Sequence, residues 1–227
     1  MIREDLKEFV ATLPNKVTLV AATKYIDIDD MEILLENGVN NFGENRVDSF
    51  LRKYDLLKNK DIVWHFIGHL QTNKVKQIVP FVHLIQSVDS WHLLEVINAE
   101  AAKVGRVVNV LLEVHVAKEE TKTGFDLSSF HPFSHSALPN VQILGLMAMA
   151  TNTDDETEIR RCFREAKAIK EEVCQRSGLP AKRSFSDSGL SATAVLSIGM
   201  SDDYLLAIEE GSTMVRIGTA IFGPRQY

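Results

Sequence analysis

The chain has 227 residues, 45% of them hydrophobic, and a formal net charge of −6. A chain of this length can bury one substantial core, and its acidic balance argues against a nucleic-acid-binding surface. No apolar run approaches the roughly 20 residues that a membrane-spanning helix needs, and Met1–Asp5 does not have the pattern of a signal peptide. We therefore expect a cytoplasmic protein with no nucleic-acid partner and no membrane partner.

Short apolar runs alternate with amphipathic stretches along the chain. After an N-terminal helix, strands are predicted at 16–23, 39–42, 63–67, 83–86, 107–116, 141–147, 194–198 and 214–217. Helices are predicted at 29–36, 47–57, 73–79, 90–103, 154–176 and 202–209, with Asn37-Gly38, Pro80, Gly178 and Gly211 as stops and Ser90 as a cap. The connection from the fifth to the sixth strand is weak and interrupted by proline.

Eight strand-helix alternations with mostly continuous apolar strands predict an α/β fold. Continuous apolar strands are expected in a parallel sheet that helices cover on its faces. Eight such units in 227 residues fit one closed (β/α)₈ TIM barrel over residues 1–227. A doubly wound open sheet is the structural alternative. The absence of a G-x-G-x-x-G pattern after the first strand disfavours its dinucleotide-binding version.

The two cysteines and the strand histidines do not predict a metal site. Cys162 and Cys174 are twelve residues apart in one predicted helix, which is about 18 Å along its axis and too far for a disulfide. They are interpreted as reduced packing residues. His65 and His115 lie inside predicted strands and have no third ligand, so they are interpreted as hydrogen-bonded core residues.

The first predicted strand ends on a lysine. An ammonium at the end of a buried strand is costly unless it is compensated, and a desolvated lysine becomes an amine that forms Schiff bases with carbonyls. In a barrel of this class the reactive groups lie at the carboxyl ends of the strands, where Lys24 is predicted. The alternative interpretation is a lysine that ends its strand and extends into water.

Small and hydroxyl residues gather at the ends of the last two strands, where barrels often bind phosphate. Ser201 precedes a predicted helix, and Gly218 and Thr219 follow the final strand. Taken singly, Ser201 is explained as a helix cap and Gly218 as a turn residue. Together with Lys24 across the barrel, they favour an aldehyde that carries a phosphate, namely pyridoxal 5′-phosphate.

Several sequence segments resemble the pyridoxal phosphate homeostasis protein family. They are FGEN at 42–45, WHFIGHLQTNK at 64–74, QSVD at 86–89, GLM at 145–147, LSIGMSDD at 196–203 and GSTMVRIGTAIFG at 211–223. The family is similar in fold to the barrel domain of alanine racemase, which implies a fold-type III pyridoxal phosphate site without the C-terminal β domain. The resemblance implies a cofactor binder that acts in vitamin B6 and amino-acid homeostasis, with no established reaction.

The resemblance also implies a set of cofactor-binding residues, with no catalytic residue and no metal ligand among them. The set is Lys24, Asn45, Ser201, Arg216, Gly218 and Thr219. The lysine would form the Schiff base, and the serine, glycine and threonine would hold the phosphate. The arginine would face the pyridine nitrogen, and the asparagine would lie near the ring.

The residue facing the ring nitrogen bears on whether the protein is an enzyme. An arginine cannot accept a proton, so it leaves the nitrogen unprotonated and the ring a weak electron sink, which argues against transamination. The alternative interpretation of Arg216 is an ion pair with Glu209. Alanine racemases take their second base from a tyrosine of a separate β domain, and the chain stops at 223–227 without room for one. We therefore expect a monomeric holder of the cofactor rather than an enzyme.

Two other functions stay open at this point. One is a pyridoxal phosphate-dependent amino-acid racemase, and the more remote one is a Schiff-base aldolase that uses the lysine without a cofactor. For the holder, free amino acids or apoenzymes that need pyridoxal phosphate are the expected recipients of slow transfer.

Overall fold

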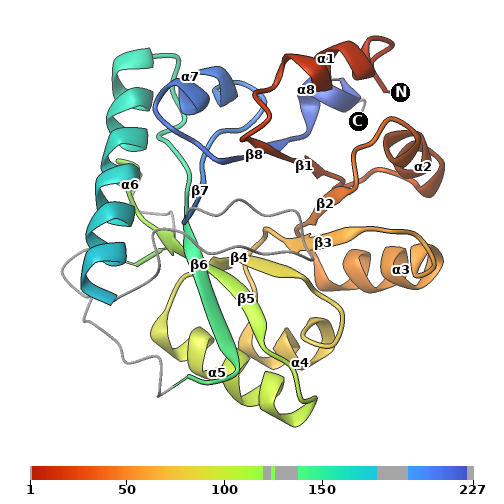
Figure 1. The fold of residues 1–227 in the computed structure, drawn as a ribbon, viewed down its shortest axis with the longest axis vertical. Coiled ribbons are helices and arrows are strands. Elements are labelled where there is room, and N and C mark those ends of the chain that lie inside the picture. The colour runs from red at the N-terminus through yellow and green to blue at the C-terminus, as the bar shows by residue number, and fades with distance from the viewer. Residues whose placement is uncertain (1, 120–123, 126–137, 178–193, 224–227) are drawn as a thin grey trace.

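Eight parallel strands close into a barrel in which each strand pairs with its neighbours in chain order and β8 pairs back with β1. The computed structural model describes residues 2–119, 124–125, 138–177 and 194–223. The helices form a ring around the strands (Figure 1). This confirms the predicted (β/α)₈ barrel and excludes the open sheet.

The strands are short and the helices vary widely in length. The strands are β1 Thr18–Ala22, β2 Asn41–Glu44, β3 Val63–Phe66, β4 Leu84–Val88, β5 Val108–Val114, β6 Val141–Ala148, β7 Val195–Ser197 and β8 Met214–Ile217. The helices are α1 Leu6–Thr12, α2 Ile28–Glu36, α3 Val47–Leu57, α4 Val75–Ile78, α5 Trp91–Lys103, α6 Glu156–Ser177, α7 Tyr204–Glu209 and α8 Thr219–Phe222, with a 3₁₀ turn, η1, at Thr72–Lys74.

The predicted elements exist, and their boundaries differ in a few places. The predicted second strand at 39–42 lies at Asn41–Glu44, because pairing with β1 continues through Gly43. The single helix predicted at 73–79 is a 3₁₀ turn followed by one short helix, and α8 was not predicted at all. The proline-interrupted connection and the predicted stop at Gly178 lie outside the described residues.

Two local predictions about helix ends are confirmed. Gly38 adopts a φ of 79° directly after α2, a conformation that glycine adopts without steric cost. Ser90 begins α5, because its hydroxyl oxygen accepts a hydrogen bond from the backbone N–H of Leu93 at 3.3 Å.

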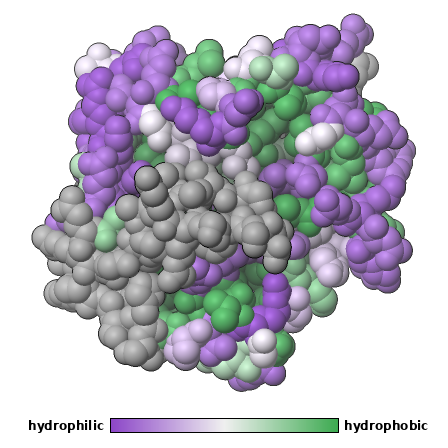
Figure 2. Space-filling view, viewed as in Figure 1, coloured by the Kyte–Doolittle hydropathy of each residue, from purple (hydrophilic) through white to green (hydrophobic). Residues whose placement is uncertain are grey.

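The core has two parts, one on each face of the barrel wall. The larger part lies between strands and helices and includes Phe42, Trp64 and Phe163. The smaller part fills the barrel interior and consists of Val20, Leu84, Leu111, Leu144, Met147, Val195 and Met214. Hydrophilic residues cover the outer surface of α6 and the side formed by α2 and α3 (Figure 2), as expected for helices that bury one face.

Both cysteines are free thiols, as predicted, and Cys162 is buried. No helix in the described part of the chain is long and apolar enough to cross a bilayer. Within the same residues, no three histidine, cysteine or acidic side chains gather in a way that could hold a metal ion.

Candidate functional site

Barrel closure brings Lys24 next to two of the segments expected to bind the cofactor. β1 pairs with β8 through Ala21 and Ile217, and with β2 on its other side. Lys24, two residues beyond β1, therefore lies at the same barrel end as Gly218 after β8 and Asn45 after β2. The expectation that Lys24 stands across the barrel from β8 is wrong, because closure makes the first and last strands neighbours.

The Lys24 side chain is half-buried and lies beside an aromatic ring. Its Nζ atom is 4.9 Å from the centre of the Tyr25 ring, and Tyr25 is 68% exposed with a φ of 69°. In the described residues no carboxylate forms an ion pair with the Lys24 ammonium. A lysine that no described carboxylate holds in an ion pair keeps its side chain available to a carbonyl carbon, as Schiff-base formation requires.

A buried ion pair holds the peptide that carries Lys24. Lys53 of α3 donates hydrogen bonds from Nζ to the Thr23 carbonyl at 2.6 Å and to Glu44 Oε1 at 2.7 Å. Thr23 Oγ1 donates to the same carboxylate oxygen at 2.5 Å, and the Lys53 and Glu44 side chains are each 1% exposed. The residue before Lys24 is therefore fixed through both its carbonyl and its side chain.

Sequence reasoning missed Lys53 because it treated the lysine as part of an ordinary amphipathic helix. The signal was present in the spacing. Val47, Phe50 and Leu57 mark the buried face of α3, and Lys53 lies three residues after Phe50 on that same face. A lysine at such a position needs a buried partner, and the strand-end Glu44 supplies it.

Ser201 connects the loop after β7 to the turn after β8. Its Oγ accepts hydrogen bonds from the backbone N–H groups of Gly218 at 3.1 Å and Ala220 at 3.2 Å. The alternative that Ser201 caps the helix following it is wrong, since α7 begins at Tyr204 with Asp203 in the cap position, and the Ser201 Oγ meets Gly218 and Ala220 instead. No described residue accepts the Ser201 hydroxyl proton. An oxygen pinned by two donors leaves that proton available for an anion.

Arg216 lies in the barrel interior and is 5% exposed. Its Nη1 donates to the Ser197 carbonyl at 2.8 Å and to Ser197 Oγ at 2.7 Å, and its Nη2 donates to the Ala148 carbonyl at 3.1 Å. The alternative ion pair with Glu209 is excluded, because Glu209 pairs with Arg160. Among the described residues, none accepts a hydrogen bond from the Arg216 Nε–H group.

Burial sets the electrostatics of this guanidinium. Desolvation lowers the pKa of Arg216 to about 10, while the negative charges of Glu113 and Asp203 act in the opposite direction. Burial also raises the pKa of the Asp203 carboxyl group, against the effect of the Arg216 charge. Arg216 therefore remains a cation at neutral pH and can only donate hydrogen bonds.

Asn45 lies on a turn that the next loop holds closely. A Cβ atom on Gly68 would come within 2.2 Å of the Asn45 carbonyl oxygen, so only glycine allows this approach. Ser87 Oγ in turn donates to the Gly68 carbonyl at 2.5 Å. The glycine and serine of the second and third motif segments thus support the backbone that places Asn45.

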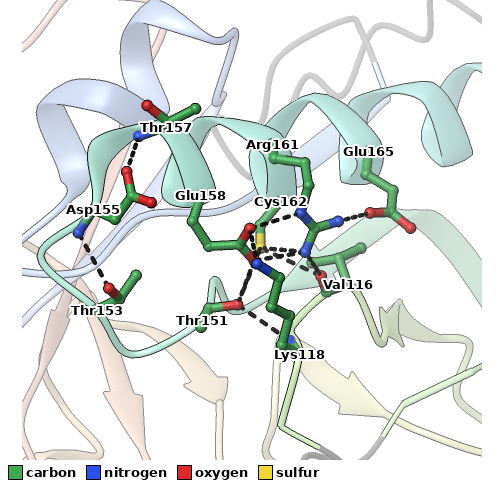
Figure 3. Close-up of polar contacts among 10 residues, drawn as sticks. All are labelled: Val116, Lys118, Thr151, Thr153, Asp155, Thr157, Glu158, Arg161, Cys162 and Glu165. Carbon is green, nitrogen blue, oxygen red and sulfur yellow. Dashed lines mark hydrogen bonds and ion pairs between the residues drawn. The ribbon is translucent and has the colours of Figure 1, made fainter.

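The loops after β5 and β6 are joined to the start of α6 (Figure 3). Arg161 donates to the Val116 carbonyl at 2.9 Å and pairs with Glu158, whose other oxygen lies 2.8 Å from Lys118 Nζ. The Lys118 N–H donates to Thr151 Oγ1 at 3.1 Å. The first residues of the loop after β5 are therefore anchored to α6 and to the loop after β6, and residues 120–123 lie outside the described residues.

His65 is a hydrogen-bonded core residue, as predicted. It is 0% exposed, with its ring nitrogens 3.0 Å from Asn41 Oδ1 and 2.9 Å from Gln86 Nε2. Burial, assisted by the nearby His83, lowers the pKa of His65 to about 3. The folded protein therefore keeps this imidazole neutral.

This lowered pKa predicts a loss of stability in mild acid. Below about pH 6.5 the unfolded chain binds a proton at His65 that the folded chain does not, so folding weakens as the pH falls toward 3. Between pH 8 and pH 5 we expect the free energy of unfolding to drop by about 2 kcal/mol more in the natural protein than in His65→Asn. Urea denaturation of both proteins at several pH values measures this difference, and parallel pH profiles would contradict it.

Comparison with known proteins first defines the class. Residues 2–226 match the family model described as alanine racemase, N-terminal domain. An alanine racemase from Clostridium difficile 630 covers 98% of this chain with a TM-score of 0.71, but is 13% identical and is matched over 56% of its own length. That likeness shows the barrel fold alone.

Closer relatives define the family. A pyridoxal phosphate homeostasis protein of Aquifex aeolicus is 39% identical over 215 residues, covering 94% of this chain and 89% of the relative. One from Escherichia coli K12 is 32% identical over 219 residues, with 94% and 88% covered. The structure of PipY from Synechococcus elongatus with PLP bound is 32% identical, has a TM-score of 0.81, and is matched over 97% of this chain and 99% of PipY. The chain belongs to the pyridoxal phosphate homeostasis protein family.

Proposed function

We propose that this chain binds pyridoxal 5′-phosphate as a Schiff base at Lys24 and serves the homeostasis of this cofactor and of amino acids in the cytoplasm. The proposal is carried by one observation: Lys24, which no described carboxylate pairs with, lies at the same barrel end as donors of Ser201 and Arg216 that no described residue accepts. Family membership supports it, because the relative PipY has a structure with PLP bound at 32% identity.

The residues present fit the chemical groups of this cofactor. The Ser201 hydroxyl retains a proton for a phosphate oxygen, and Gly218 carries no side chain where the phosphate would approach the backbone. Arg216 is 5% exposed, and its Nε–H can donate a hydrogen bond to a pyridine nitrogen. The proposed set is Lys24 for the covalent bond, Ser201, Gly218 and Thr219 for the phosphate, Arg216 for the ring nitrogen and Asn45 beside the ring.

The identity of the ring-nitrogen partner limits the chemistry. Bound pyridoxal phosphate supplies an aldehyde carbon for Lys24 and a ring that withdraws electrons from an attached amino acid. Arg216 has no site for a proton and leaves the ring nitrogen unprotonated, so the withdrawal stays weak. This supports a holder of the cofactor and disfavours transamination.

The positions of the described tyrosines support a holder over a racemase, which needs a second base. The Tyr25 ring lies next to Lys24, on the lysine side of the site. Tyr54 stacks on Phe50, and Tyr204 packs edge-on against Phe9, so both rings belong to the packing around helices. We propose that the protein exchanges bound cofactor slowly with free amines or apoenzymes and has no dedicated turnover, with a weak racemase as the second candidate.

Titration with pyridoxal phosphate, followed by absorbance and paired with an alanine racemisation assay, tests the function. We expect a visible Schiff-base band and a racemisation rate no higher than that of the free cofactor. A rate well above that background would favour the racemase. A protein that the cofactor leaves colourless would contradict the proposal and return the aldolase to consideration.

Replacing Arg216 with glutamate tests the contact with the ring. A carboxylate at this position would keep the ring nitrogen protonated, so we expect the visible band of Arg216→Glu to shift from that of the natural protein. Arg52→Glu, an equal charge change at an exposed position on α3, is the control and should leave the band in place. If the Arg216→Glu spectrum were unchanged, Arg216 would not contact the ring.

A further inference from the structure

A row of hydrogen-bonded polar side chains crosses the barrel interior beside the apolar interior cluster. Its members lie on β8, β7, β4, β3 and β2, and they are Arg216, Ser197, Gln86, His65 and Asn41. The first three lie two residues along their strands from the interior residues Met214, Val195 and Leu84, so they face the same interior. Gln86, Ser197 and His65 are 0% exposed.

The row is continuous from the carboxyl end of the barrel toward its amino end. Arg216 Nη1 lies 2.7 Å from Ser197 Oγ, which lies 2.7 Å from Gln86 Oε1. Gln86 Nε2 lies 2.9 Å from His65 Nδ1, and His65 Nε2 lies 3.0 Å from Asn41 Oδ1. We call these residues the interior chain.

The chemistry of its first member sets the direction of every bond in the interior chain. A guanidinium only donates, so Ser197 Oγ accepts from Arg216 and must give its own proton to Gln86 Oε1. The Gln86 amide nitrogen then faces His65 Nδ1, which must accept, and the imidazole proton lies on Nε2 and points to Asn41. All donors point away from Arg216, and every acceptor presents its oxygen or nitrogen lone pair toward the cation.

Stability alone gives little reason for such a chain. Barrel interiors are ordinarily filled by branched apolar side chains, and well-packed apolar replacements of buried polar groups are often neutral or stabilising. A fully satisfied polar network does rigidify the groups it contains, since each bond polarises the next. The group made rigid in this way is the Arg216 guanidinium. Its Nη1 donates to both oxygens of Ser197, and its Nη2 donates to the Ala148 carbonyl. Its Nε–H is thereby kept in one direction.

We propose that Ser197, Gln86, His65 and Asn41 are positioning residues that hold the Arg216 guanidinium against the pyridine nitrogen of bound pyridoxal phosphate. The proposal rests on the proposed function. Of the five residues, Arg216 alone is proposed to meet the cofactor, and the other four form a hydrogen-bonded row that begins at its Nη1 atom. The effect of these four residues must therefore pass entirely through Arg216.

A double-mutant cycle tests this path. The proteins are the natural chain, Gln86→Leu, Arg216→Met and the double variant, each titrated with pyridoxal phosphate while the absorbance spectrum is recorded. We expect Gln86→Leu to shift the visible band and to raise the dissociation constant about tenfold, the effect of weakening one hydrogen bond to a charged donor. In the Arg216→Met background, the same change should produce neither a further shift nor a further loss of affinity.

Two additional variants separate positioning from folding. Ser197→Ala cuts the interior chain with a smaller change and should shift the band in the same direction as Gln86→Leu. Ser212 is a buried serine that is not a member of the interior chain: it is 2% exposed, and its hydroxyl donates to the Ile198 carbonyl at 2.8 Å. Ser212→Ala should therefore leave the spectrum unchanged. Melting curves identify any variant that has lost its fold.

The outcomes separate this inference from the proposed function. If Gln86→Leu and Ser197→Ala gave the natural spectrum and affinity, or if the Gln86→Leu effect persisted without Arg216, the positioning role would be overturned while cofactor binding stood. If the natural protein itself formed no visible band with pyridoxal phosphate, the proposed function would fail and this inference with it.

Discussion

Replacing Lys24 with alanine should abolish the visible Schiff-base band of the protein loaded with pyridoxal phosphate and leave its folding intact. The band requires an amine at this position, and the described residues provide Lys24 with no carboxylate partner whose loss would destabilise the fold. Its only described aromatic contact is the Tyr25 ring at 4.9 Å. We expect the free energy of unfolding to change by less than about 0.5 kcal/mol, the usual range for surface substitutions. Absorbance titration and urea denaturation measure the two quantities.

Lys74→Ala is the matched control for this change. Lys74 is also half-buried, and it lies at the end of η1, in the connection that leaves the carboxyl end of β3. Its loss should preserve the band. A Lys24→Ala protein that still formed the full visible band would show that another lysine binds the cofactor.

Replacing Lys53 with methionine should cause the largest loss of stability of any single change considered. The variant leaves the Glu44 carboxylate buried without its cation and removes the donor to the Thr23 carbonyl. Breaking a buried ion pair in this way costs about 3–5 kcal/mol of the free energy of unfolding. The affinity for pyridoxal phosphate should fall as well, because the peptide that carries Lys24 loses its anchor. Urea denaturation and cofactor titration test the two effects.

An exposed ion pair at the C-terminal end of α3, the helix that carries Lys53, provides the control. Lys58 pairs with Asp55 at 3.1 Å, with the two side chains 58% and 75% exposed, so Lys58→Met should cost less than about 1 kcal/mol. Removing both buried charges in Lys53→Met with Glu44→Leu should recover part of the stability, since no unpaired charge is left inside. Equal losses in Lys53→Met and Lys58→Met would show that the buried pair does not hold the strand end.

The parts of the fold governed by local sequence were the predictable ones. α3 and β8 have the predicted bounds, because an amphipathic period or a continuous apolar run determines each of them. Gly38 and Ser90 end and begin helices as predicted, since left-handed glycine and hydroxyl caps depend only on neighbouring residues. Lys24 was identified by its position after an apolar strand, and its role stays a prediction.

The contacts between distant segments were not predictable. The bonds from Gly218 and Ala220 to Ser201 join the loops of two strands, and no local pattern reveals which turn a serine will face. Lys53 meets Glu44 only because α3 folds back on β2. The direction in which Gln86 points depends on strand register, and a one-residue slip would move it to the other face of the barrel wall.

Borohydride reduction of the protein loaded with pyridoxal phosphate, followed by peptide mapping with mass spectrometry, tests the central claim most directly. Reduction converts a Schiff base into a stable secondary amine and so marks the lysine that formed it. We predict that one reduced pyridoxyl phosphate group is found per chain, on the peptide that contains Lys24. A modification spread over exposed lysines, or its absence from Lys24, would contradict the account.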